Sequence, residues 1–201
     1  MVARISQKIS LALLKGNAIN QEELNVYTYG IQLLILTVFD WCITFFIMIL
    51  LGKVWLSLIY FAVFISLRHH CGGYHAKTHL RCVLASNTVY VLSVGFALFL
   101  TERNSTAGFV LGEIINFIIL FYFAPTEHKN KPISEKELKK HKCIGRVLNM
   151  FLSCIAFMFM FIGARQYAWI VLLGQLSVSI AIMLEKGKKD KTLNKKGGKC
   201  K

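Results

Sequence analysis

Proline is nearly absent from this sequence: Pro125 and Pro132 are the only two, and both lie between the same pair of long apolar segments. A proline inside a helix removes a backbone hydrogen bond, so at these positions both can end helices without breaking one. Acidic residues are also scarce, with 10 Asp and Glu against 24 Lys and Arg, which gives a formal charge of +14. Such charge can attract nucleic acid, but the loops contain neither stacking aromatic residues nor a recognisable RNA- or DNA-binding motif. We therefore expect no nucleic acid partner.

A cleavable secretion signal is not expected either, because residues 1–25 have no sustained apolar core and no small-residue cleavage site. Ile5, Ile9 and Leu13 instead recur every four residues, with basic residues between them. This spacing predicts an N-terminal amphipathic helix that lies in the headgroup region of a membrane. A solvated N-terminal arm is the alternative.

A disulfide framework is not expected, although the chain has six cysteines. Cys42 and Cys154 lie inside apolar segments, and the other four lie in or beside basic connections. If those connections are cytosolic, their thiols stay reduced.

Long apolar segments dominate what is present, since 55% of the residues are hydrophobic and they gather in blocks with almost no charge. A helix needs about 20 mostly apolar residues to cross the hydrocarbon core of a bilayer. The sequence therefore predicts an all-α, polytopic membrane helical bundle over residues 26–185, with about six transmembrane segments. Four crossings with two re-entrant segments are the alternative, and the second segment is the shortest. The expected segments are 27–51, 53–68, 83–100, 107–124, 144–163 and 166–184.

The basic residues lie on alternate sides of these segments. Only Lys53, Arg103 and Arg165 fall in the second set of connections, and all other Lys and Arg residues fall in the first set or at the two ends. Because basic loops stay on the cytoplasmic side, we expect a multi-pass membrane protein with both termini and the 68–82 loop in the cytoplasm. Residues 186–201 are expected to form a basic cytoplasmic tail attracted to anionic lipid.

The chemistry concentrates in residues 68–82, which hold four of the six histidines and two cysteines. Cys82 precedes an apolar segment, so it would lie near the N-terminus of a helix, where exposed N–H groups and nearby Arg81 stabilise negative charge on sulfur. A thiolate and an imidazole together can cleave an amide by nucleophilic catalysis. The sequence predicts this chemistry for Cys82 with His75.

The spacing of this pair requires a break in the chain. On one straight helix, residues seven apart lie about 10 Å from one another along the axis. A working imidazole must come within roughly 3 Å of the sulfur or of a bridging water. Gly72 and Gly73 give the backbone freedom to turn, so we expect a helix that starts near Thr78 or later.

Metal binding is the competing interpretation of the same segment. Cys71, His75, His79 and Cys82 have a C-x3-H-x3-H-x2-C spacing, and two histidines four apart can share a zinc ion. No Glu follows His75 to act as a base, as it does in H-E-x-x-H peptidases. We predict no cofactor, with a metal-binding peptidase or sensor and a non-catalytic transporter as alternatives. Taken singly, His69, His70 and His79 are more simply explained by contact with headgroup phosphates.

Arg68, Gly73, His75, Ala76, Lys77 and Cys82, at these spacings, resemble the active segment of the accessory gene regulator B family. The likeness extends to the apolar layout and to the connection around Asn130-Lys131-Pro132-Ile133. It implies a membrane cysteine peptidase that cleaves a quorum-sensing propeptide and promotes its cyclisation to a thiolactone or lactone through an acyl thioester. It also implies Cys82 as the nucleophile, His75 as its proton-transfer partner, and a homodimer.

The resemblance further implies a substrate with an amphipathic leader and an acidic tail, which basic connections suit. Lys129 and Lys131 are the preferred substrate-binding pair, although contact with anionic lipid explains any single lysine equally well. Arg68 is expected to orient the site or to bind a carboxylate, because its guanidinium stays charged. Ser86, one turn beyond Cys82, is expected either to donate a hydrogen bond near the site or to bond within its own helix.

Overall fold

The structure, a computed structural model, describes residues 2–72, 79–103, 105–124 and 135–197, and these residues form helices and short turns without any strand. The all-α prediction is therefore confirmed. The chain divides into two compact units, Met1–Gly52 and Lys53–Lys201. In chain order the elements are α1 (Val2–Lys15), η1 (Gln21–Glu23), α2 (Leu24–Leu50), α3 (Val54–Cys71), α4 (His79–Glu102), α5 (Thr106–Phe123), α6 (Glu135–Phe161) and α7 (Arg165–Gly197).

The first unit consists of α1 and η1 with the long helix α2. Helix α1 packs on α2, and Ser6 and Ser10 are fully buried. The hydroxyl of Ser10 donates to the carbonyl of Ser6, so this small polar face carries no free hydroxyl donor. Ile5 and Ile9 remain exposed, so α1 has an apolar stripe outside its contact with α2. The predicted N-terminal amphipathic helix is thus present.

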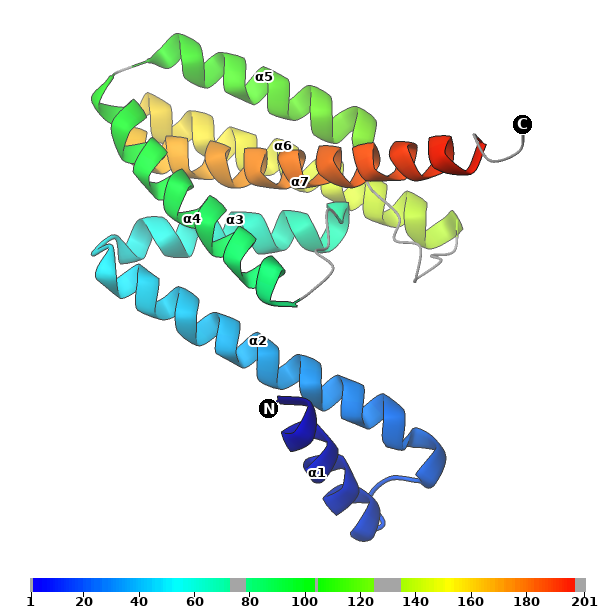
Figure 1. Cartoon of the computed structure of the whole chain (residues 1–201). Coiled ribbons are helices and arrows are strands. Elements are labelled where there is room, and N and C mark those ends of the chain that lie inside the picture. The colour runs from blue at the N-terminus through cyan, green and yellow to red at the C-terminus, as the bar shows by residue number, and fades with distance from the viewer. Residues whose placement is uncertain (1, 73–78, 104, 125–134, 198–201) are drawn as a thin grey trace. The chain divides into compact units, whose positions relative to one another are not determined.

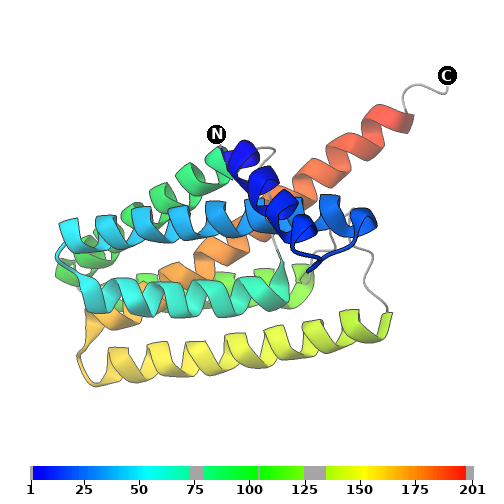
Figure 2. The ribbon, with the colours of Figure 1, turned by 90° about the horizontal axis from the view of Figure 1, so that it is seen from below.

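Helix α7 is the central helix of the second unit and packs against each of α3, α4, α5 and α6 (Figure 1). In its apolar portion 61% of the residues are buried, against 33% or fewer in the other helices of this unit. Helices α3 and α6 also run side by side, as both views show (Figures 1 and 2).

Six helices are long and apolar enough to cross a membrane, which confirms the expected number within the described residues. The second span, Val54–Cys71, is one continuous helix, and its 18 residues rise roughly 27 Å, close to the thickness of a hydrocarbon core. The protein is therefore a multi-pass membrane helical bundle. Its helices α4 and α6 begin at His79 and Glu135, several residues before the apolar segments expected at 83–100 and 144–163.

A buried polar network joins α5, α6 and α7 in the middle of the bundle. The Gln175 amide donates to the Asn149 side-chain oxygen at 2.9 Å and to the Ser153 hydroxyl at 3.2 Å. Asn116 donates to the same Asn149 oxygen at 3.1 Å, and the Ser153 hydroxyl donates to the Glu113 carboxyl at 2.7 Å. Because lipid offers no alternative partners, such bonds specify which helix faces meet.

Two further polar contacts join α3 to α4 and to α7. The hydroxyls of Ser57 and Tyr90 lie 2.6 Å apart, and the Tyr60 hydroxyl donates to Ser177 of α7 at 3.1 Å. Tyr60 and Tyr90 are almost completely buried. These contacts fix the α3–α4 pair, whose adjacent ends carry the residues of chemical interest.

Candidate active site

The chain turns sharply where α3 ends. Gly72 caps α3 with φ 72° and ψ −148°, in a region that residues with a Cβ rarely adopt. Helix α4 begins at His79. The two helices are therefore separate, as the proposed chemistry of His75 and Cys82 requires.

Cys82 lies in the first turn of α4 and is half-buried. Arg68, in the last turn of α3, lies close enough for its charge to interact with Cys82. The α4 N-terminus adds the partial positive charge of its unpaired backbone N–H groups. Cys82 thus has two sources of positive charge nearby.

The Arg68 side chain lies beside the Phe64 ring of the same helix. Its guanidinium carbon lies 5.7 Å from the centre of the Phe64 ring, and the neighbouring Leu67 is fully buried. An arginine positioned this way presents a fixed charge rather than a freely moving one.

The hydroxyl of Ser86 is engaged within α4. It donates to the Cys82 carbonyl at 2.9 Å and approaches the Val83 carbonyl at 3.1 Å. The structure thus shows the intrahelical bond, which ties Ser86 to the backbone at Cys82.

Cys71 is buried where α3 packs against α6. Its side chain is 1% exposed, and its sulfur lies so close to α6 that a Cβ added at Gly145 would approach it to 2.9 Å. Cys71 therefore fills the space that Gly145 leaves between α3 and α6.

Three histidines gather beside Cys71, on α3 and α6. The Nδ1 atoms of His70 and His141 lie 3.3 Å apart, and the ring of His69 stands edge-on to that of His70 with centroids 5.0 Å apart. His141 is not among the residues predicted for the site, and His70 was expected to contact lipid headgroups. The contact spans 71 positions of the sequence, so no local signal could have revealed it.

Several predicted site residues lie outside the described residues: Gly73, His75, Lys129 and Lys131. The side chain of His79 lies outside them too. Among the described residues, no three or more His, Cys, Asp or Glu side chains are grouped so that they could hold a metal ion. The four-residue metal site proposed as the alternative includes His75 and His79, so it stays untested.

Most described basic residues of the second unit belong to one set of helix ends. The C-terminal ends of α3 and α7 and the starts of α4 and α6 lie at the same end of this unit (Figure 1). Near these helix ends along the chain are Arg68, Arg81, Lys142, Arg146 and Lys186. Lys53, Arg103 and Arg165 flank the opposite helix ends. This arrangement matches the charge asymmetry of the sequence and puts Cys82 at the basic end.

Comparison with known proteins shows the family of the chain. The family described as Accessory gene regulator B matches residues 4–183. A putative AgrB-like protein of Clostridium perfringens is 30% identical over 74% of this chain and 71% of its own. The accessory gene regulator protein B of Staphylococcus aureus (strain JH9) is 28% identical over 85% of this chain and 88% of its own, and that of Staphylococcus intermedius is 26% identical over 74% and 80%. No solved structure matches. The chain, a multi-pass membrane protein, therefore belongs to the accessory gene regulator B family.

Proposed function

We propose that this chain is a membrane-embedded cysteine endopeptidase that cleaves a quorum-sensing propeptide and promotes cyclisation of the signal segment. The observation that carries the proposal is the position of Cys82, in the first turn of α4 and within reach of the Arg68 charge. A half-buried thiol in a positive environment at the membrane edge suits attack on a peptide that arrives along the membrane surface.

The first step is thioester formation. His75 accepts the Cys82 thiol proton, and the sulfur attacks the carbonyl carbon of the last residue of the future signal segment. The resulting oxyanion is stabilised by backbone N–H groups at the start of α4. The C–N bond then breaks, the leaving amine takes the proton from His75, and the acidic tail departs.

The second step is ring closure. A Cys or Ser side chain of the bound peptide loses its proton to His75 and attacks the thioester carbonyl, and the carbon–sulfur bond to Cys82 breaks. The proton returns to Cys82, and the product is a thiolactone or a lactone. The thioester retains acyl-transfer potential that hydrolysis would waste, so the half-buried position of Cys82 favours cyclisation by limiting access of water.

Arg68 acts on this chemistry through its charge. It stabilises the ionised sulfur and orients the site, or it binds a substrate carboxylate. Lys129 and Lys131 are proposed to bind the acidic tail of the precursor. The proposed working unit is a homodimer in the bacterial cell membrane, with both termini and the 68–82 loop in the cytoplasm.

The test uses the full chain reconstituted in anionic vesicles with a synthetic propeptide that has an amphipathic leader and an acidic tail. Cys82→Ala and His75→Ala are each expected to abolish release of the tail. Cys143→Ala and Cys154→Ala are matched controls, because both residues are exposed free cysteines elsewhere in the bundle. Both controls are expected to retain cleavage.

The covalent intermediate provides an independent readout. Mass spectrometry of the working enzyme should find the leader-plus-signal acyl group on Cys82, and hydroxylamine should remove it. Normal cleavage by Cys82→Ala would refute the proposal. Loss of cleavage with chelator, together with a need for Cys71 and His79, would replace it with the metal-dependent alternative, and absence of any cleavage by the wild type would favour the transporter.

A further inference from the structure

A groove runs between α5 and α6, with a volume of about 370 Å³. Phe117, Leu120 and Phe121 line it from α5, and Asn149 and Met150 line its deeper part from α6. From Lys139 to Met150 the groove follows α6 for roughly 16 Å, about half the thickness of a hydrocarbon core.

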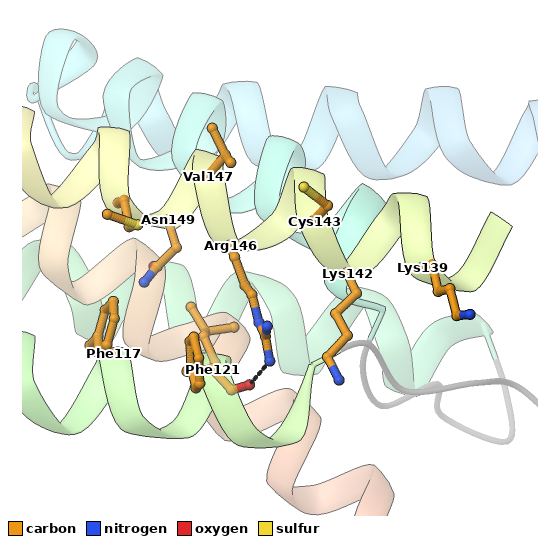
Figure 3. Close-up of a pocket in the computed structure, with 10 residues that line it drawn as sticks. Phe117, Phe121, Lys139, Lys142, Cys143, Arg146, Val147 and Asn149 are labelled. Carbon is orange, nitrogen blue, oxygen red and sulfur yellow. Dashed lines mark hydrogen bonds between the residues drawn. The ribbon is translucent and has the colours of Figure 1, made fainter. Parts of the chain in front are cut away.

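The charge in this groove lies only at one end. Lys139, Lys142 and Arg146 have the i, i+3, i+7 spacing of one helix face, and all three project from α6 on the side of α5 (Figure 3). No Asp or Glu is among the described residues that line the groove. A ligand that fits must therefore carry negative charge at one end and be apolar along the rest.

Arg146 is held in place for such a ligand. One terminal nitrogen donates to the Phe121 carbonyl at 2.8 Å, and the guanidinium carbon lies 3.9 Å from the centre of the Phe121 ring (Figure 3). Its Nε is buried and has no hydrogen-bond partner among the described residues. A buried donor of this kind is costly unless something accepts from it, and guanidinium groups pair well with phosphate oxygens.

The surroundings of the groove are those of lipid. Phe117, Val147 and Met150 are exposed on helices that are long and apolar enough to span a membrane. An extended acidic peptide would place some of its charges against Phe117 and Met150, which is unfavourable. A phospholipid has its charge in the headgroup alone, so its shape and charge match both parts of the groove.

We propose that the α5–α6 groove binds one anionic phospholipid, with its phosphate on Arg146, Lys142 and Lys139 and an acyl chain along Phe117, Val147 and Met150. Basic pockets between transmembrane helices bind phospholipid headgroups by the same combination of charge and apolar wall. The bound lipid neutralises the charge of these three basic side chains and stabilises the packing of α5 on α6 at the end of the bundle that carries Cys82.

The experiment measures binding to the delipidated full-length protein by native mass spectrometry. The probes are phosphatidylglycerol, phosphatidylcholine with the same acyl chains, inorganic phosphate and a short acidic peptide. A single phosphatidylglycerol is expected to bind at least tenfold more tightly than phosphatidylcholine, and phosphate or the peptide should not displace it. Phosphatidylcholine binding as tightly, or preferential binding of the peptide or of phosphate alone, would overturn the proposal.

Variants locate the site without relying on activity. Lys139→Gln with Lys142→Gln should weaken phosphatidylglycerol binding at least tenfold, because two of the three headgroup contacts are lost. Lys140→Gln is the matched control: it lies on the same helix and is exposed, but it does not line the groove. It should bind lipid like the wild type, and a loss equal to that of the double variant would place the lipid elsewhere. Far-UV circular dichroism of the delipidated variants should match the wild type, and Arg146→Gln should give the same loss of lipid binding.

Discussion

The contact between Cys71 and Gly145 yields a prediction that combines packing with chemistry. In Gly145→Ala the new Cβ would come within 2.9 Å of the Cys71 sulfur, closer than van der Waals contact allows. Overpacking of this kind costs about 1–3 kcal/mol, whereas replacing a helical glycine by alanine gains roughly 0.5–1 kcal/mol where space is free. Gly145→Ala should therefore be neutral to destabilising in the wild-type background.

Without the Cys71 sulfur, Gly145→Ala should stabilise the protein instead of destabilising it. Cys71→Ala alone should cost on the order of 1 kcal/mol, because it deletes one well-packed heavy atom. In that background, Gly145→Ala fills the vacated space without a clash. The two substitutions should therefore show a favourable coupling free energy of about 1–3 kcal/mol.

The assay is reversible unfolding in mixed micelles, with SDS as the denaturant and far-UV circular dichroism as the readout. Gly95→Ala is the matched control, since no atom lies within 4 Å of where its Cβ would be. Gly95→Ala should have the same effect in both backgrounds. If Gly145→Ala does so too, the packing of Cys71 against α6 is refuted.

The same variants distinguish between the two chemistries of residues 68–82. A packing role predicts that Cys71→Ala keeps most of its propeptide cleavage once the protein is folded in vesicles. A metal ligand at Cys71 predicts that cleavage is lost even though the fold is kept. Activity and stability measured on the same samples separate these outcomes.

Three further predictions concern the bundle. Gln175→Leu removes the bonds to Asn149 and Ser153, and at roughly 0.6 kcal/mol per bond in a membrane this should lower the unfolding free energy by about 1–2 kcal/mol. Thr101→Val loses only an intrahelical bond and should lower the unfolding free energy less. Equal losses in the two variants would contradict a stabilising role of the network. Tyr90→Phe removes the contact with Ser57 and should cost about 0.5–1.5 kcal/mol by the same assay, while no loss would show that the 2.6 Å contact does not stabilise the bundle. A membrane-impermeant maleimide should label Cys143 in inside-out vesicles and not in right-side-out vesicles; the reverse would contradict the predicted cytoplasmic side of the α6 N-terminus.

Hydropathy and charge predicted much of this fold because each transmembrane helix is constrained mainly by its own composition. The six spans and the helix break after Gly72 follow from local properties: apolar length, glycine freedom and the spacing of His75 from Cys82. Hydropathy located the apolar parts of α4 and α6 but not their full lengths, since both helices continue into polar residues near the membrane surface.

The contacts between helices could not be predicted in the same way. Asn116, Asn149 and Gln175 are visible in the sequence as polar residues in apolar segments, yet nothing local says that they meet. The contact of His70 with His141 and the bond of Arg146 to Phe121 depend on how α6 packs against its neighbours. These pairings arise from tertiary packing, which hydropathy does not encode.

The polar network also bears on the order in which the protein is synthesised. Gln175 and Ser179 belong to α7, which leaves the ribosome after α5 and α6, and they donate hydrogen bonds to Asn149 and Asn116. Until α7 enters the bilayer, Asn116 and Asn149 can bond to each other but lack the donors that α7 supplies. Insertion of α7 therefore completes the hydrogen bonds that hold α5 and α6 in the bundle. In a nascent chain stopped before residue 165, the earlier helices should pack loosely and be more susceptible to proteolysis.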